Sequence, residues 1–171
     1  MRRPEIAWNF AEKYEGWTSK AGPLRAPETI SLGDWSRQGL EFFSGIGHYE
    51  TEIDIAALSP NERLRIDLGR VGVSAEVFVN ERSAGIVCVA PWTLDITDLV
   101  QPGRNALRIA VANTLANYFA QFRELDGAAL SSGGERPEKR VSGLLGPVVL
   151  RTIRTENGRD GRSGQSGQKE P

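Results

Sequence analysis

The sequence predicts an all-β fold, an antiparallel sandwich or barrel. Apolar and polar residues alternate with a period of two over several short stretches, which is the pattern of strands with one buried face. Clusters of Gly, Pro, Asn and Ser separate those stretches at nearly regular spacing. No long stretch has a convincing 3.6-residue period, so the strands are expected to bury their apolar faces against one another.

The alternation is clear in the predicted strand His48–Ile55. Alternate residues from Tyr49 to Ile55 take one face, and His48 with three acidic residues takes the other. Strands with the same alternation are predicted at Arg63–Leu68, Ser74–Asn80 and Asn105–Asn113, and a last strand at Val148–Ile153. Ile6–Phe10 and Glu28–Leu32 are weaker strand candidates.

Two short helical elements are predicted besides the strands. Thr97 can cap a single helical turn over 98–100, which ends at Pro102-Gly103. Asn117–Leu125 can form a short helix. Residues 126–140 contain a Ser-Ser-Gly-Gly run and Pro137, which predict a loop.

Length and charge restrict the class of protein. The 171 residues suit one domain, at roughly 100–200 residues per domain. The 21 basic and 22 acidic residues give a net charge of −1, which argues against a nucleic-acid or anionic-membrane partner. The N-terminus has no apolar signal-peptide core, and the apolar stretch Ile86–Trp92 is too short to span a bilayer. We therefore expect a cytoplasmic protein by default, or a piece of a larger exported one.

The single cysteine and single histidine exclude several kinds of site. Cys88 cannot form an intrachain disulfide, and a multi-histidine metal site is impossible with His48 alone. Cys88 lies in an apolar stretch and is expected to be a small buried hydrophobic residue. Ser44 and His48 are four residues apart, which allows a nucleophile and base, but an exposed histidine at the start of a strand is the preferred interpretation.

Several motifs follow one another in a familiar order. They are Leu68-Gly69-Arg70-Val71, then Ala75–Asn80, then Ala90–Val100, then Pro102–Leu107, and finally Val111–Asn117. Phe43-Ser44-Gly45 precedes them, and Gly143-Leu144-Leu145-Gly146-Pro147 follows them. In this order and spacing the chain resembles the sugar-binding domain of family 2 glycoside hydrolases. It is closest to the version at the C-terminal end of large rhamnosidase-like hydrolases.

The resemblance extends over about residues 5–153 and implies the fold in more detail. It implies a jelly-roll β-sandwich of the galactose-binding-domain-like kind over residues 1–155. Residues 156–171 lack aliphatic and aromatic side chains, so a disordered Gly/Ser/Gln-rich tail is expected there. The family usually has an Asn-Gly turn where this chain has Asn80-Glu81, and we therefore expect a wider loop at that position.

A sugar site normally combines an aromatic platform with amide, carboxylate or guanidinium groups. Trp92 is the best platform candidate and Tyr118 the second. Asn113, Asn117 and Arg123 can supply polar contacts from a neighbouring segment. The alternative is that Trp92 packs over the end of the sandwich as part of the core, while Asn80 and Asn105 are expected to form turns rather than bind a ligand.

The acidic residues give weaker evidence of a functional site. Glu50, Glu52 and Asp54 share one strand face, and a solvated face is the preferred interpretation over a catalytic one. The resemblance makes a structural calcium at Asp95 and Asp98 conceivable. Two carboxylates are too few for the 6–8 oxygens that calcium takes, and no cofactor is expected. Asp98 is better explained as the acidic residue in the first turn of a helix.

The sequence thus predicts a carbohydrate-binding or accessory module of a glycoside hydrolase that is not an enzyme on its own. The resemblance places catalysis in a separate barrel domain, for which this chain is too short. The alternative is a structural domain that packs on a catalytic barrel and binds no sugar. The expected partners are therefore a carbohydrate or a glycoside hydrolase catalytic domain.

Overall fold

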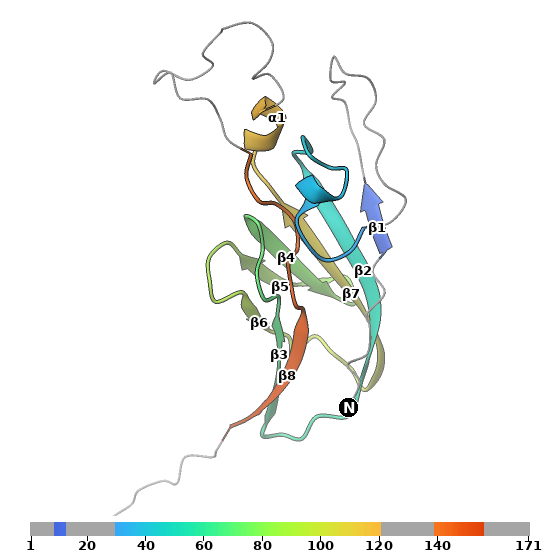
Figure 1. Ribbon diagram of the computed structural model, residues 1–171. Helices are drawn as coiled ribbons and strands as arrows, with labels where there is room; N and C mark the ends of the chain where they lie inside the picture. Colours follow the sequence, from blue (N-terminus) through green and yellow to red (C-terminus); the bar gives the residue numbers. More distant parts are fainter. Residues whose placement is uncertain (1–8, 13–29, 121–138, 156–171) are drawn as a thin grey trace, which may run out of the picture.

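The computed structural model describes residues 9–12, 30–120 and 139–155, and within them β-strands predominate and helix is scarce (Figure 1). The strands are β1 (Asn9–Glu12), β2 (Ile46–Ile55), β3 (Glu62–Asp67), β4 (Ser74–Val79), β5 (Arg82–Val87), β6 (Thr93–Asp95), β7 (Gly103–Ala112) and β8 (Val149–Arg154). The helical elements are a 3₁₀ turn, η1 (Trp35–Arg37), and a five-residue helix, α1 (Ala116–Ala120).

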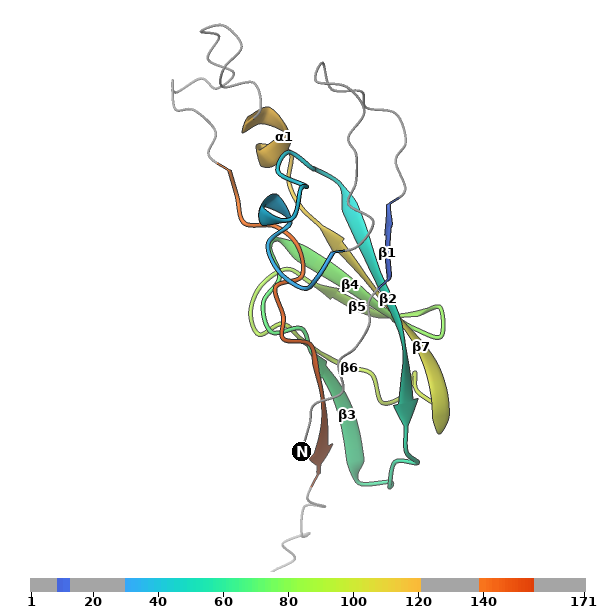
Figure 2. The same cartoon turned by 45° about the vertical axis from the view of Figure 1, so that its right-hand side comes forward.

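The strands form two antiparallel sheets. A five-stranded sheet has the order β1-β2-β7-β4-β5, and a three-stranded sheet has the order β6-β3-β8. Figures 1 and 2 show β3 and β8 on one side of the molecule and β2 and β7 on the other. The predicted all-β antiparallel sandwich is confirmed.

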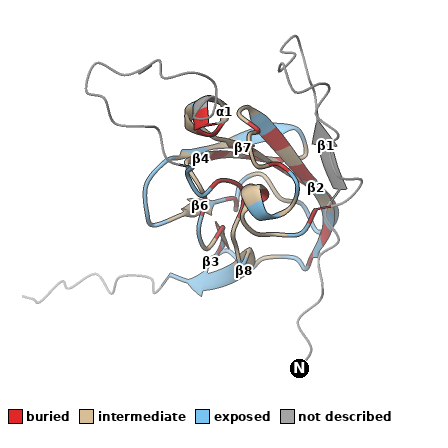
Figure 3. Ribbon diagram, turned by 45° about the horizontal axis from the view of Figure 1, so that its top comes forward, coloured by how far each residue is buried: buried red, intermediate tan, exposed pale blue. Residues whose placement is uncertain are grey.

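The longest pairing in the fold joins β2 to β7, from Ile46 opposite Ala112 to Ile55 opposite Gly103. Along both strands alternate residues are buried, including Tyr49, Ile53 and Ile109, as the period of two predicted. The core lies between the sheets, where these side chains meet buried residues of β4 and β3 such as Val77 and Ile66. In Figure 3 the buried red segments lie on β2, β4 and β7, whereas β8 is largely exposed.

Glycines let three segments cross closely at one end of the sandwich. Residues 142–145 run between two earlier segments. On one side, the N–H groups of Gly33 and Trp35 donate to the carbonyls of Leu144 and Ser142 respectively. On the other side, the Gly72 N–H donates to the Gly143 carbonyl, and the Leu145 N–H donates to the Arg70 carbonyl. A Cβ on Gly143 would lie 2.6 Å from the Trp35 ring, and one on Gly69 would lie 2.3 Å from the Gly146 carbonyl oxygen. Gly69 and Gly143 therefore stand where the close crossing leaves no room for a Cβ atom.

A buried polar contact fixes the 3₁₀ turn against the core. Trp35 and Tyr49 are both fully buried, and the indole Nε1–H donates to the Tyr49 hydroxyl at 2.6 Å. The same hydroxyl accepts from the Leu144 N–H at 3.4 Å. Burial raises the pKa of the Tyr49 phenol, although these two hydrogen bonds act in the opposite direction.

The hairpin between β4 and β5 corrects one expectation. The loop has only two residues, Asn80 and Glu81, and their φ angles of 49° and 63° fit a type I′ turn. The wider loop predicted there is wrong. Asn80 supports the turn because its amide donates to the Asn105 side chain at 2.8 Å and accepts from the Ala106 N–H at 3.0 Å.

Two single residues also differ from prediction. Cys88 is exposed rather than buried, because β5 ends at Val87 and the chain bends away from the sheet. His48 is half-buried rather than exposed, and its Nδ1 atom is buried with no hydrogen-bond partner. It faces the outer side of β2, between Ala11 of β1 and Ala110 of β7 in register.

The remaining elements agree in part with prediction. Strands β5 and β6 had not been predicted, and residues 30–32 of the weak candidate at 28–32 are not a strand. The helical turn expected over 98–100 is a hydrogen-bonded turn in which Leu99 and Val100 donate to the Ile96 carbonyl. Residues 1–8 and the tail 156–171 lie outside the described residues. No described helix has the length and apolar character needed to cross a bilayer.

Candidate functional site

Three of the predicted sugar-binding residues follow the end of β7. At this end Ala112 pairs with Ile46, and the chain continues through Asn113 into α1 with Asn117 and Tyr118. Segments from distant parts of the sequence meet here, as Figure 1 shows for α1 and the start of β2. We call this region, residues 43–46, 112–118 and 140–142, the loop end.

Asn113 holds the chain that leads into β2. Its side-chain oxygen accepts from the Gly45 N–H at 2.8 Å, and its side-chain nitrogen donates to the Phe43 carbonyl at 2.8 Å. Its backbone N–H also donates to the Gly45 carbonyl. The amide therefore bonds on both sides to backbone.

Asn117 does the same for the chain that leads toward β8. Its side-chain oxygen accepts from the Arg140 N–H at 2.7 Å, and its nitrogen donates to the Arg140 carbonyl at 2.9 Å and to the Ser142 hydroxyl at 3.3 Å. Both Asn117 and Ser142 are buried. Sugar contacts by Asn113 and Asn117 stay a prediction, and the structure gives both amides a role in fixing loops.

Tyr118 is half-buried, and its backbone N–H donates to the Ser44 hydroxyl at 3.0 Å. The Ser44 hydroxyl therefore contacts the α1 backbone at the loop end. Because His48 Nδ1 has no hydrogen-bond partner, Ser44 does not bond to that nitrogen. Arg123, the fifth predicted site residue, lies outside the described residues.

Trp92 lies in the segment between β5 and β6, whereas the two asparagines lie in the segment after β7. Its side chain is half-buried and packs against the core, and its carbonyl accepts from the Leu68 N–H at 2.8 Å. The described hydrogen bonds and ring contacts do not join Trp92 to Asn113 or Asn117. Packing against the core agrees with the alternative interpretation of Trp92, while part of the side chain stays accessible.

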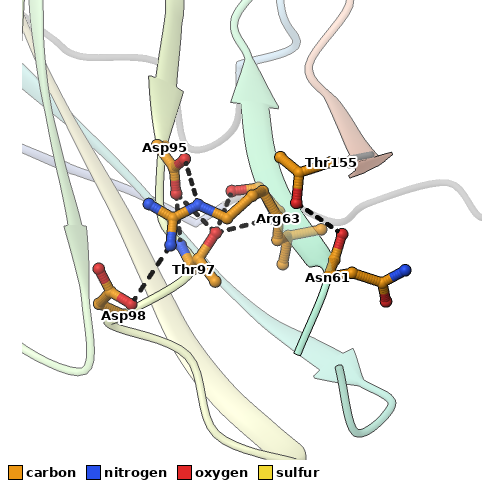
Figure 4. A network of polar contacts seen from close by, with 7 residues as sticks. Asn61, Arg63, Asp95, Thr97, Asp98 and Thr155 are labelled. Carbon is orange, nitrogen blue, oxygen red and sulfur yellow. Dashed lines mark hydrogen bonds and ion pairs between the residues drawn. The ribbon is translucent and has the colours of Figure 1, made fainter. Parts of the chain in front are cut away.

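Asp95 and Asp98 belong to a polar network at the edge of the smaller sheet (Figure 4). The Arg63 guanidinium lies 3.3 Å from an Asp95 oxygen and 3.8 Å from an Asp98 oxygen. Thr97 links this network to β3, because its hydroxyl accepts from the Leu64 N–H at 2.8 Å and donates to Asp95 at 2.6 Å. The Thr97 hydroxyl is therefore used across the sheet rather than as the predicted helix cap.

The Thr97 hydroxyl is the main cause that lowers the pKa of Asp95, and Arg63 lowers it further. A calcium ion does not fit between Asp95 and Asp98, because the Arg63 cation already faces both carboxylates. In residues 9–12, 30–120 and 139–155, no three His, Cys, Asp or Glu side chains are grouped as metal ligands.

The three carboxylates on β2 lie on the outer face of the large sheet. Glu50, Glu52 and Asp54 are all exposed, and Glu52 pairs with Arg104 of β7 at 3.4 Å. This is the solvated face that the sequence predicted. Glycoside hydrolysis needs two carboxyl groups that flank the scissile bond, and a single row along one strand does not provide that arrangement.

Sequence reasoning missed the residues that build the loop end around its backbone. Ser142, Arg140 and Gly45 become partners of the asparagines only because β7 ends beside β2 and the segment before β8 returns to α1. The signal available was the Gly-Leu-Leu-Gly-Pro motif, which marks the returning segment but not its neighbours.

Comparisons with known proteins find similarity to parts of glycoside hydrolases. A rhamnosidase from Novosphingobium sp. PP1Y superposes with a TM-score of 0.63 and 32% identity, over 75% of this chain and 13% of that one. A putative β-glucuronidase from Formosa agariphila is 36% identical over 91 residues, which is 50% of this chain and 8% of that protein. This chain matches a glycoside hydrolase-associated domain. No family model matches it.

A more distant structure shows the same fold. The β-glucuronidase of Bifidobacterium dentium, solved with coumarin-3-O-glucuronide, has a TM-score of 0.61 at 18% identity, over 90% of this chain and 30% of that one. The chain therefore spans only a small part of the length of the hydrolases it matches. The predicted resemblance to a domain of glycoside hydrolases is confirmed by the similarity to the rhamnosidase and to the putative β-glucuronidase.

Proposed function

We propose that this chain is a non-catalytic accessory domain of a glycoside hydrolase. The observation that carries the proposal is the 32% identity to a segment that makes up 13% of a rhamnosidase. A segment of that size leaves most of the relative's chain for other domains. The carboxylates weighed as candidate site residues support the same proposal, because those on β2 are exposed in one row and those near β6 are engaged by Arg63.

The finer proposal is that the domain is of the galactose-binding-like jelly-roll kind and binds carbohydrate. Trp92, between β5 and β6, and Tyr118, in α1, are both half-buried, and an accessible ring can stack on the apolar face of a sugar. Asn113 and Asn117 would shape the surface by holding its backbone, and Arg123 would supply a charged contact. The names of the relatives suggest oligosaccharides with rhamnose or glucuronate ends as first probes.

Carbohydrate binding can be tested by affinity electrophoresis and by titration with those oligosaccharides. Trp92→Ala and Tyr118→Ala are expected to weaken retention about fivefold or more, since one stacked ring contributes on the order of 1 kcal/mol or more. Phe78→Ala is the control, because Phe78 is also half-buried but lies on the outer face of β4 beneath Arg108. Equal loss in all three variants, or retention unchanged in the first two, would contradict carbohydrate binding by these rings.

A second candidate function is structural packing on a catalytic domain without sugar binding. The specific observation in its favour is that the polar atoms of Asn113 and Asn117 already bond within the chain. In that case none of the oligosaccharides is retained, and Trp92→Ala lowers the melting temperature through lost core packing. In both cases the purified chain is expected to hydrolyse no aryl glycoside, and turnover that Glu50→Gln or Glu52→Gln abolishes would overturn the proposal.

A further inference from the structure

Arginine side chains gather on the outer face of the small sheet. Leu64 and Ile66 of β3 are buried in the core, so Arg63 and Arg65, which alternate with them, face outward. The register places Arg65 directly opposite Arg151 of β8, and both side chains are exposed. Like charges directly opposite each other on neighbouring strands are destabilising, and an anion between them would offset their repulsion.

The carboxylates on this face already have partners. One Asp67 oxygen lies 3.3 Å from the Arg151 guanidinium, and the other accepts a backbone N–H at 2.9 Å. Asp95 of β6 is opposite Arg65 on the other side, but one of its oxygens lies 3.3 Å from Arg63 (Figure 4). Its second oxygen accepts a hydroxyl and a backbone N–H. Both carboxylates are therefore engaged by groups other than Arg65.

Arg65 differs in this respect from the other arginines of the two sheets. Seven arginines lie on the strands that the structure describes, and six of them bond to a carboxylate or to a backbone carbonyl. The Arg65 side chain makes no hydrogen bond or ion pair to the described residues. A guanidinium carries five N–H donors in a planar fork that matches the two oxygens of a carboxylate. The central strand of the small sheet therefore presents an unpaired fork beside a second guanidinium.

We propose that Arg65 and Arg151 bind a carboxylate of an acidic oligosaccharide, a chain that contains uronate units. This inference rests on the proposed carbohydrate binding and names the class of sugar. A carboxylate between the two forks accepts from both and offsets their repulsion. Ile153, which is opposite Arg63 on the same face and 38% exposed, offers apolar surface for the C–H groups of that sugar.

The site is exposed, so binding should be weak and sensitive to salt. The Arg151 side chain is 63% exposed, and Arg65 beside it is exposed as well. Ion pairs at such positions contribute little individually and are screened by salt. A chain in which several uronate units follow one another should therefore bind more tightly than a single uronate.

Titration of the full chain with oligogalacturonate, followed by NMR signals of the arginine Nε–H groups, tests the proposal. The matched neutral probe is the same oligosaccharide with its carboxylates methyl-esterified. The Arg65 and Arg151 signals should move with the acid and not with the ester. Arg65→Gln should weaken binding of the acid about fivefold and leave the ester unaffected. Arg70→Gln is the control, because Arg70 is also exposed and its side chain has no described partner, but it lies outside the strands.

The outcomes separate this inference from the proposed function. If the acid and the ester bind equally and Arg65→Gln changes neither, carbohydrate binding stands and the acidic specificity is overturned. Equal weakening by Arg70→Gln overturns it too, since net charge rather than the paired arginines would then attract the acid. Binding of oligoglutamate as tight as that of oligogalacturonate overturns the sugar as the ligand in favour of an acidic peptide. If no oligosaccharide binds to the wild type, carbohydrate binding itself fails.

Discussion

At the start of β7 the Asn105 amide binds backbone next to it in the sequence, whereas just beyond the end of β7 the Asn113 amide binds backbone 68 and 70 residues away. Asn105 accepts from the Gln101 N–H at 2.8 Å and donates to the Gln101 and Gly103 carbonyls. Asn117 resembles Asn113, because its partners Arg140 and Ser142 are 23 and 25 residues away. Asn105 thus closes a local turn and adds one bond from the Asn80 side chain, 25 residues away, whereas Asn113 and Asn117 bond only to distant segments.

This difference has consequences for stability. The Asn105 turn fixes a few residues of its own segment and the Asn80 side chain, and the loss of its contacts should be limited to them. The loop end holds the segments before β2 and before β8, so a change there releases long stretches of chain from the core. Variants matched between the two ends should separate these effects.

The largest expected difference is between two glycines. Gly143→Ala should lower the free energy of unfolding by about 3 kcal/mol or more, because a Cβ would lie 2.6 Å from the Trp35 ring and φ is +101°. Gly103→Ala should cost about 1 kcal/mol, since φ is +90° but nothing lies within 4 Å of the added carbon. Urea denaturation measures both. Similar losses in the two variants would show that backbone strain, and not the close crossing, sets the cost.

The next comparison removes one asparagine from each end. Asn105→Ala and Asn117→Ala are each expected to cost about 2–3 kcal/mol, because each residue is buried and leaves several backbone groups without their partner. Asn113→Ala, at a half-buried site, should cost about 1 kcal/mol. The order is checked by thermal and urea unfolding. An Asn113 variant as unstable as the other two would contradict the role assigned to burial.

A third experiment asks how far each loss spreads. In Asn113→Ala the Gly45 amide should exchange with solvent about five times faster, while the Gln101 amide is unchanged, since a loss of about 1 kcal/mol corresponds to about fivefold. In Asn105→Ala the Gln101 amide should exchange faster and the Gly45 amide should be unchanged. Exchange resolved by residue in NMR spectra distinguishes the two. Faster exchange at both amides in either variant would mean that the ends are coupled.

The smallest effect concerns Asp95, in the segment that leads to the Asn105 turn. Its pKa is lowered in the folded state by the Thr97 hydroxyl, so its stabilising contribution is complete above the unfolded value of about 3.9 and is lost as the pH falls through the lower folded pKa. The side chain is 34% exposed, which limits the contribution to a few tenths of a kcal/mol. Asp95→Asn should show a flatter fall in stability below about pH 4. An identical acid limb in both proteins would contradict this.

The sequence was sufficient to predict the layers of this fold but not the contacts at the loop end. The period of two in His48–Ile55 and Asn105–Asn113 reports which side chains are buried, because burial alternates along a strand regardless of its partner. β5 was missed because its glycine and its exposed apolar residues break the alternation. Type I′ geometry at Asn80-Glu81 was missed because the usual glycine is absent, although the asparagine amide compensates with bonds to Asn105 and Ala106.

Site residues were harder to predict than strands. An asparagine near aromatic residues suits a sugar site and a loop clamp equally well, and only the position of Phe43, Gly45 and Arg140 in space reveals the bonds that Asn113 and Asn117 make. Cys88 is exposed because the chain bends after β5, and nothing in its apolar neighbours indicates that bend. Local patterns thus carry information on burial within strands and little on contacts between distant segments.

The crossing of Ser142–Leu145 between two earlier segments has a consequence for biosynthesis. Residues 33–35 and 70–72 emerge from the ribosome well before residues 142–145, so their backbone hydrogen bonds to this segment form only after it has been synthesised. Completion of the core around Trp35 waits for Leu144, which supplies a backbone donor to Tyr49. A nascent chain stalled before Ser142 would contain strands β2 to β7 but would lack the segment that lies between residues 33–35 and 70–72.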